Sequence, residues 1–329
     1  MSDSGAGTVL TTRPIRFSAD GDADPDDVAA AVRIIVASDV AAIGEPDSGD
    51  ADIASMFAKP SMDRAASVLH VRGDHVVGVT WIENDVNGRD TFIDSFCLPG
   101  PSSQAVRDHG IELGLTAARR HRAAAPDGDL WTARAGCWLS ETEYAAVLEA
   151  HGFRPARTFY RMRIASSSQQ VPARMPPLPP GVEIVVSDDE VTRRRILAVD
   201  NDSFGEHYNF TAREYDEWWA HWSAGTTRDP AGWWLLTVDG EDAAICLLDE
   251  SRAEIGDGYV SVLGVRKEFR GRGLAQLLLR RAFVHYRDRG RAGTQLGVDA
   301  ENTTGAVRVY ESVGMTAIRT VQGYAQPID

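Results

Sequence analysis

The feature that most constrains this chain is a glycine-containing loop between a strand pattern and a helix pattern. We predict the strand over 258–265 and the helix over 273–289. The loop and the start of the helix form one run: Arg270, Gly271, Arg272, Gly273, Leu274 and Ala275. Glycines allow the backbone to bend tightly and to approach a ligand without Cβ clashes. The N–H groups of such a loop and of the first helical turn attract anions, so we predict a pyrophosphate site.

Two better-known phosphate loops do not fit this run. A Rossmann fingerprint needs GxGxxG inside a parallel βαβ unit and an acidic residue after the next strand. A Walker A loop needs Gly-Lys followed by Ser or Thr, and no such triplet follows here. A glycine turn before a helix also occurs by chance, so the interpretation depends on the surrounding sequence.

A proline-rich segment divides the chain. It covers residues 166–181 and contains five prolines, which cannot donate backbone hydrogen bonds and favour extended chain. A length of 329 residues suits two domains of about 150 residues each. We therefore expect one domain over 1–165, a linker or strap over 166–181, and a second domain over 182–329.

The two halves resemble each other in sequence. The run from Val147 to Phe153 is similar to the run from Val309 to Met315, at a constant offset of 162 residues. Each half also contains a hairpin pattern upstream. A repeat of this length indicates a duplicated domain rather than a solenoid.

Two motifs of the second half resemble the GNAT superfamily of acyl-CoA-dependent N-acetyltransferases. The first is a strand ending in Leu263-Gly264-Val265, followed by the loop that begins at Arg270. The second is Asn302 after the next strand, followed by Tyr310-Glu311 and Gly314. The resemblance implies an α+β fold with two tandem GNAT-like domains, each a mixed, mostly antiparallel sheet flanked by helices.

The resemblance also implies a co-substrate and roles for particular residues. In this superfamily two neighbouring strands splay apart and hold the pantetheine arm of acetyl-CoA. Leu263, Gly264 and Val265 would bind that arm through their backbone, the loop from Arg270 to Ala275 would hold the pyrophosphate, and Arg270 and Arg272 would add positive charge. Tyr310 would protonate the departing thiolate, although a packing role is the alternative. Asn302 would contact the pantetheine or cap the following helix.

The first half lacks the corresponding loop. A strand is predicted over 92–98, but the next residues include Pro99 and Pro101, which remove two N–H donors. Leu148 occupies the place of Tyr310. We expect a degenerate first domain and catalysis in the second. The tandem layout is similar to that of the mycothiol synthase group of actinobacterial acetyltransferases, in which a glutamate base occupies the position of Tyr259.

Candidates for the acceptor site lie before and along the strand. The candidate bases are Asp257, His207, Glu206 and Glu254, or a water held by Ser261 and Tyr259. His207 is a candidate because of its near-neutral intrinsic pKa. Strand alternation places Asp257, Tyr259, Ser261, Leu263 and Val265 on one face. Candidate substrate contacts are Glu206, Trp218, Trp222 and Tyr259, since cations bind aromatic faces. Core packing is the alternative for the tryptophans.

The net charge of −14 opposes binding to nucleic acid or an anionic membrane and favours a cationic amine. Three separated cysteines argue against a disulfide scaffold or a metal site. We expect a cytoplasmic monomer or homodimer that acetylates a small amine-bearing molecule by direct transfer, with acetyl-CoA and no metal. The alternatives are a protein or peptide N-acetyltransferase and a non-catalytic acyl-CoA-binding module.

Overall fold

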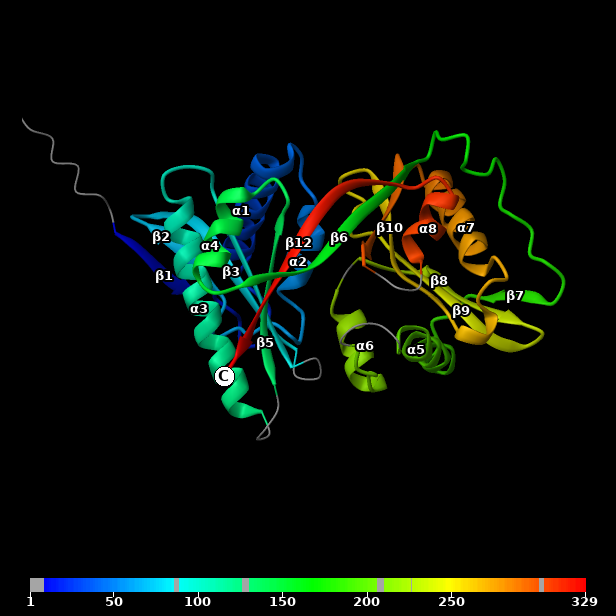
Figure 1. The fold of residues 1–329 in the computed structure, drawn as a ribbon, viewed down its shortest axis with the longest axis horizontal. Helices are drawn as coiled ribbons and strands as arrows, with labels where there is room; N and C mark the ends of the chain where they lie inside the picture. Colours follow the sequence, from blue (N-terminus) through cyan, green and yellow to red (C-terminus); the bar gives the residue numbers. More distant parts are fainter. Residues whose placement is uncertain (1–8, 86–88, 126–129, 206–209, 226, 302–304) are drawn as a thin grey trace, which may run out of the picture. The chain divides into compact units, whose positions relative to one another are not determined.

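The computed structural model describes residues 9–85, 89–125, 130–205, 210–225, 227–301 and 305–329. Contacts divide the chain into two compact units (Figure 1). Unit 1 comprises Met1–Asp47, Met56–Ala156 and Gln322–Asp329, and unit 2 comprises Ser48–Ser55 and Arg157–Val321. None of the helices in the described ranges combines the length and apolar character needed to cross a membrane.

Unit 1 contains a sheet in the strand order β1-β2-β3-β4-β5-β12, where only the last part of β12 belongs to this unit. Strands β1 to β4 pair antiparallel, and β4 pairs parallel with β5. Its elements are β1 (Leu10–Pro14), α1 (Pro25–Ile43), β2 (Val68–Arg72), β3 (His75–Asp85), β4 (Asp90–Cys97), α3 (Ser103–Ala124), β5 (Trp131–Trp138) and α4 (Thr142–Ala150). A short helix, α2 (Asp50–Met56), falls almost wholly within the segment assigned to unit 2.

Unit 2 contains a sheet in the order β12-β6-β11-β10-β9-β8-β7. Its only described parallel pair is β10 with β11. Its elements are β6 (Arg154–Ala165), β7 (Val182–Val185), α5 (Glu190–Phe204), α6 (Tyr215–Ala224), β8 (Arg228–Val238), β9 (Glu241–Asp249), β10 (Asp257–Val265), α7 (Leu274–Asp288), β11 (Gly293–Asp299), α8 (Ala306–Ser312) and β12 (Thr316–Ile328). Both sheets are mixed and mostly antiparallel with flanking helices, which confirms the predicted fold class.

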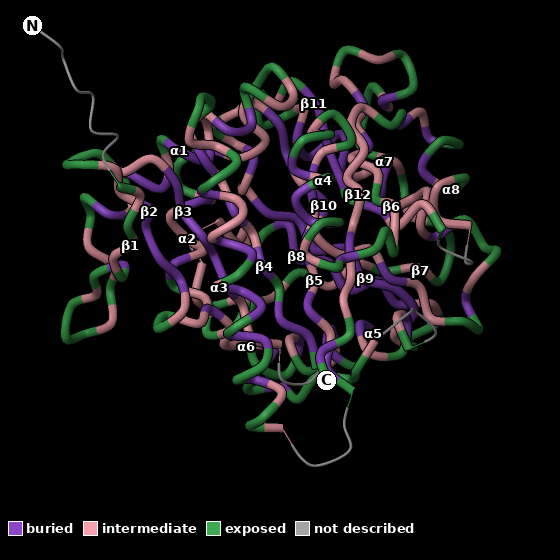
Figure 2. Tube along the Cα trace, turned by 60° about the vertical axis from the view of Figure 1, so that its left-hand side comes forward, coloured by how far each residue is buried: buried purple, intermediate pink, exposed green. Residues whose placement is uncertain are grey.

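Strand β9 of unit 2 is buried along most of its length (Figure 2). Alternation along β9 directs Cys246 and Leu248 to a core shared with α7 and α8. Ile245 and Leu247 face the other core, which includes residues of α5 and α6. Side chains alternate across a strand, so a continuous apolar run such as that of β9 serves two cores.

The observed units differ from the domain limits that we expected at 165 and 182. Strand β6 lies in the sheet of unit 2, between β11 and β12. The proline-rich segment packs on α7, because Arg281 and Arg287 donate to the carbonyl oxygens of Pro176 and Pro172. At the other end, the last eight residues belong to unit 1, where Ile328 is buried in the core.

Candidate active site

A gap opens between the two central parallel strands of unit 2. Although β10 and β11 are both fully described, they pair over just three residue pairs, from Asp257 with Gly293 to Tyr259 with Gln295. Beyond that point β10 continues to Val265 on β9, and β11 continues to Asp299 on β6. The backbone groups along this divergence are therefore available to an extended ligand, as at a sheet edge.

A β-bulge at Ser261 changes the direction of the side chains of β10. Leu248 of β9 pairs with Val260 and its neighbour Leu247 pairs with Val262, so Ser261 is the extra residue. Val260 and Leu263 consequently pack in the same core beside α7, whereas Val262 packs against the opposite core. An inserted residue shifts all later side chains to the other face. Our expectation that residues 257, 259, 261, 263 and 265 share one face is therefore wrong.

The loop after β10 has the conformation that its glycines predict. Gly271 and Gly273 have φ angles of 76° and 77°, in the left-handed region that glycine adopts without a Cβ penalty. Helix α7 begins directly afterwards, and its first hydrogen bond to the loop runs from Leu277 N to Gly273 O. The N–H groups of the preceding helical residues have no intrahelical acceptor, which makes this end of α7 suited to an anion.

Arg270 holds this loop in place. Its Nε donates to Val265 O at 3.1 Å, and its Nη2 donates to Ser203 O at 3.1 Å, so it joins the end of β10 to the end of α5. Its positive charge is favourable beside the carbonyl end of a helix. Arg272 is exposed, and its guanidinium lies 5.0 Å from the ring centre of Phe269.

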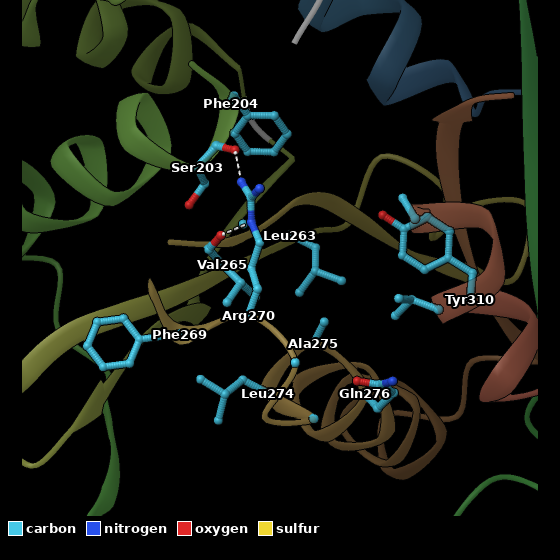
Figure 3. Close-up of a pocket in the computed structure, with 15 residues that line it drawn as sticks. Ser203, Phe204, Leu263, Val265, Phe269, Arg270, Leu274, Ala275, Gln276 and Tyr310 are labelled. Atoms are coloured by element: carbon cyan, nitrogen blue, oxygen red, sulfur yellow. Dashed lines mark hydrogen bonds between the residues drawn. The ribbon is translucent and has the colours of Figure 1, made fainter. Parts of the chain in front are cut away.

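These elements enclose one cavity of about 260 Å³ (Figure 3). It is lined by Ser203, Phe204, Leu263, Gly264, Val265, Phe269, Arg270, Gly271, Gly273, Leu274, Ala275, Gln276, Ala306, Val309 and Tyr310. Eight of the predicted acetyl-CoA residues are in this set, and Arg272 is not. Asn302 lies outside the described residues.

Tyr310 enters the cavity from α8, on the side opposite the loop (Figure 3). Its side chain is 9% exposed. Burial raises the pKa of its phenol to about 12, and the nearby Cys246 and Tyr259 act in the same direction. The hydroxyl is therefore protonated at neutral pH and can serve as a proton donor.

The structure does not bring Asp257 into the cavity. Its carboxylate accepts from Arg163 Nε at 2.6 Å and Nη2 at 2.9 Å, and from Gln295 Nε2 at 2.7 Å. The residue is 4% exposed and precedes Leu263 by roughly 20 Å along the strand. A carboxylate held in this way does not fit the predicted role of a base at the thioester. The other candidates before α6, Glu206 and His207, lie outside the described residues.

The predicted aromatic acceptor residues have different environments. Trp218 is fully buried, packs against Trp233, and donates from Nε1 to Asp200 at 3.2 Å. Trp222 packs against the same core. Neither tryptophan lines the cavity, so core packing, our alternative, describes Trp218. Tyr259 is partly exposed at the point where β10 and β11 separate.

Several lining residues were not predicted from the sequence. Ala306 and Val309 share one face of α8 with the predicted Tyr310, as the i, i+3, i+4 spacing would have indicated. Ser203 and Phe204 end α5 and contact the cavity because Gly264 admits a close approach. A Cβ on Gly264 would lie 2.9 Å from the Cβ of Ser203.

Unit 1 repeats the divergence of two parallel strands, because β4 pairs with β5 over just three residue pairs among the described residues, from Asp90 with Thr132 to Phe92 with Arg134, but its other described features differ. The loop between β4 and α3 runs only from Leu98 to Ser102, whereas its counterpart runs from Arg266 to Gly273. A cavity at this place is lined by Arg107 and Glu141, which form an ion pair. The pairing of β3 with β4, both described throughout these pairs, has no register shift and hence no bulge.

Comparison with known proteins agrees with this geometry. The acetyltransferase (GNAT) family matches residues 193–315. A mycothiol acetyltransferase of Streptomyces avermitilis is 34% identical over 265 residues, which cover 75% of each chain. The chain belongs to the GNAT family of acetyltransferases.

Two solved structures have the same fold over nearly the whole chain. A GCN5-related N-acetyltransferase from Sphaerobacter thermophilus has a TM-score of 0.78 at 24% identity, covering 97% of this chain and 96% of its own. A tandem GNAT protein from the clavulanic acid biosynthesis pathway has a TM-score of 0.71 at 14% identity, with 98% and 99% covered. At these identities the similarity shows the fold alone. That fold is the tandem arrangement that we predicted from the sequence.

Proposed function

We propose that this chain transfers the acetyl group of acetyl-CoA to the amine of a small molecule, by direct transfer in a ternary complex. The observation that carries the proposal is a single cavity that joins the loop before α7 to the hydroxyl-bearing ring of Tyr310. The loop supplies N–H donors for a pyrophosphate, and the divergence of β10 from β11 supplies backbone groups for the pantetheine arm.

The chemistry requires one bond to form and one to break. The amine nitrogen attacks the thioester carbonyl carbon, a C–N bond forms, and the C–S bond breaks. Tyr310 donates its proton to the departing sulfur, the proton lost by the amine passes to the base or to water, and Tyr310 regains a proton from solvent. A positioned general acid of this kind typically contributes ~10²–10⁴ in rate. His207 remains a predicted base, while the contacts of Asp257 favour a structural role for that residue.

We place catalysis in unit 2. The bulge in β10, the glycine loop and the cavity tyrosine all belong to unit 2, and the described residues of unit 1 have a shorter loop, an unbulged β4 and Leu148. The name of the relative, mycothiol acetyltransferase, supports a small-molecule acceptor for this chain.

The test is thiol release from acetyl-CoA by the full chain with small amines, with peptides bearing free N-termini, and with no acceptor. We expect release that depends on small amines, and a product heavier by one acetyl group in mass spectrometry. Release that depends on peptides alone would favour a protein N-acetyltransferase. Binding of acetyl-CoA without release under any condition would favour a binding module.

A further inference from the structure

The bulge in β10 brings a serine hydroxyl to a carboxylate of β9. Val260 packs in the core beside α7, so alternation directs Ser261 to the opposite side of the sheet. Leu248 packs in the same α7 core, so its neighbour Asp249 also faces the opposite side. There the hydroxyl of Ser261 donates a hydrogen bond to Asp249 Oδ2. We call these two residues the Asp249–Ser261 pair.

Several hydrogen bonds fix the orientation of the Asp249 carboxylate. Its Oδ1 accepts from the backbone N–H of Ser251 at 2.9 Å and from the Ser251 hydroxyl at 2.5 Å, while Oδ2 accepts from Ser261. Asp249 is 8% exposed, so these bonds lie in a largely desolvated place. Electrostatic interactions are stronger in such a place than in water. The carboxylate is therefore both fixed in direction and able to act on the group next to it.

Ser261 is the member of the pair that a ligand can reach. It is partly exposed, whereas Asp249 is buried. Because the Ser261 hydroxyl gives its proton to Asp249, the lone pairs of its oxygen are available as hydrogen-bond acceptors. The carboxylate behind it increases the negative charge on that oxygen. Such an oxygen suits an N–H donor, and most of all a nitrogen that carries positive charge.

The pair lies where the acceptor is expected to meet the thioester. Tyr259 is the last residue of β10 that pairs with β11, so it marks the apex of the gap. Leu263 lines the cavity that contains Tyr310. Ser261 lies midway between Tyr259 and Leu263 in the strand, roughly 7 Å from each. A pantetheine arm that enters the gap from the loop before α7 would bring its thioester end towards this point.

We propose that the Asp249–Ser261 pair is the subsite for the amino group of the acceptor. Ser261 accepts a hydrogen bond from the amine N–H, and Asp249 is a positioning residue that orients the Ser261 hydroxyl. This inference rests on the proposed acetyl transfer in unit 2 and names residues that hold its acceptor.

The pair also stabilises charge during the reaction. As the amine nitrogen attacks the thioester carbon, a C–N bond forms and the nitrogen gains positive charge. The fixed carboxylate of Asp249 stabilises that charge through the Ser261 hydroxyl, as a preorganised dipole does. Both residues keep their own protons throughout, and the proton that the amine loses passes to the base or to water.

The test is steady-state kinetics of the full chain with the small primary amine that supports the fastest thiol release. We expect Ser261→Ala to lower kcat/KM for the amine by about 10- to 100-fold, as loss of a hydrogen bond to a charged group does, with KM for acetyl-CoA unchanged. Asp249→Asn keeps the shape and removes the charge, so it should act in the same direction. The double variant should be no worse than Ser261→Ala, because Asp249 acts through Ser261.

Ser261→Thr keeps the hydroxyl and suits a strand, so it should retain most of the activity. The matched control is Ser187→Ala, which removes another hydrogen bond from a serine to an aspartate, Asp189, at residues that do not line the cavity. It should leave kcat/KM unchanged.

Three results would overturn the inference and leave acetyl transfer intact. They are a Ser261→Ala protein with the wild-type kcat/KM for the amine, a Ser261→Thr protein as impaired as Ser261→Ala, and a parallel rise in KM for acetyl-CoA. Absence of thiol release from the wild type with every amine would overturn the proposed function together with the inference.

Discussion

At the scale of single residues, burial decides what the titratable groups of this protein can do. Tyr310 is nearly enclosed, and the same enclosure that raises its pKa to about 12 brings it beside the gap between β10 and β11. Asp257 is also buried, but its carboxylate accepts hydrogen bonds from Arg163 and Gln295. A tyrosine with a raised pKa is protonated at physiological pH and can donate a proton, whereas the hydrogen bonds of Asp257 hold its carboxylate outside the cavity.

Replacement of Tyr310 by Phe tests the proton-donor role. The substitution keeps the ring that lines the cavity and removes the hydroxyl. We expect kcat to fall by ~10²-fold or more, with little change in the Kd for acetyl-CoA measured by calorimetry. Tyr286→Phe is an informative comparison, since that hydroxyl is buried in hydrogen bonds to backbone carbonyls away from the cavity. An unchanged kcat in Tyr310→Phe would show that water or another group supplies the proton.

The buried His70 should make the free energy of unfolding depend on pH. It is fully buried, its Nε2 lies 2.7 Å from the Thr80 hydroxyl, and burial, assisted by His109, lowers its pKa to about 4. An unfolded histidine has a pKa of about 6.5, so between these values the unfolded chain binds more protons. The free energy of unfolding should therefore rise with pH from about 4 to 6.5, and acidification from pH 7 to 5 should cost about 2 kcal/mol at this site.

The measurement is urea unfolding of the wild type and of His70→Gln at pH 7 and pH 5. Glutamine can still bond to Thr80 but does not titrate. The wild type should lose about 2 kcal/mol more than the variant over this interval. Equal losses in the two proteins would contradict the assignment of this slope to His70.

At the scale of elements, the sequence predicts this site well where a residue type has a strong conformational preference, as glycine has for tight loops. Gly271 and Gly273 predicted a tightly bent loop before α7, and in the structure both residues have positive φ angles. The face of β10 was predicted wrongly because strict alternation was assumed. Nothing in the residue type of Ser261 distinguishes a bulge from a regular strand residue, since the bulge is fixed by pairing with β9. The contacts of Asp257 could not be predicted from the sequence for a related reason, because its partner Arg163 is distant in sequence.

The loop can be tested by two substitutions that differ in charge alone. A side chain at Gly273 meets no atom within 4 Å, but it must adopt a positive φ, which Asn and Asp tolerate better than most residues. We expect Gly273→Asn to weaken acetyl-CoA binding and Gly273→Asp to abolish it, because a carboxylate would face the pyrophosphate. The matched control is Gly256→Asp, which also has a positive φ and no atom within 4 Å. Equal affinities of the Asn and Asp variants would contradict a phosphate site at this loop.

At the scale of the whole molecule, the last strand, β12, contributes residues to both units. The first part of β12 belongs to unit 2, and its last residues supply Tyr324 and Ile328 to the core of unit 1. The similarity between the two halves predicted a duplicated domain but not this exchange. The division of β12 between the two units leaves no pattern in the local sequence, because both parts of the strand have the composition of an ordinary strand.

Ile328→Ala tests this connection. The residue is 7% exposed in the core of unit 1, and truncation of a buried Ile typically costs 2–5 kcal/mol. We expect unit 1 to unfold at lower urea concentration, as followed by the fluorescence of its buried Trp131 in variants that lack the other tryptophans. Pro327→Ala, at an exposed neighbour, is the control and should change little. An Ile328→Ala protein as stable as the wild type would contradict the burial of this strand end.

The most direct test of the central claim, that unit 2 alone holds the acetyl-CoA site, is calorimetric titration of the full chain with acetyl-CoA. The wild type and Gly273→Asp are measured in parallel. The account predicts one site per chain in the wild type and none in the variant, because the loop after β10 has the required glycines and the loop after β4 does not. Two sites in the wild type, or one site that persists in Gly273→Asp, would contradict it.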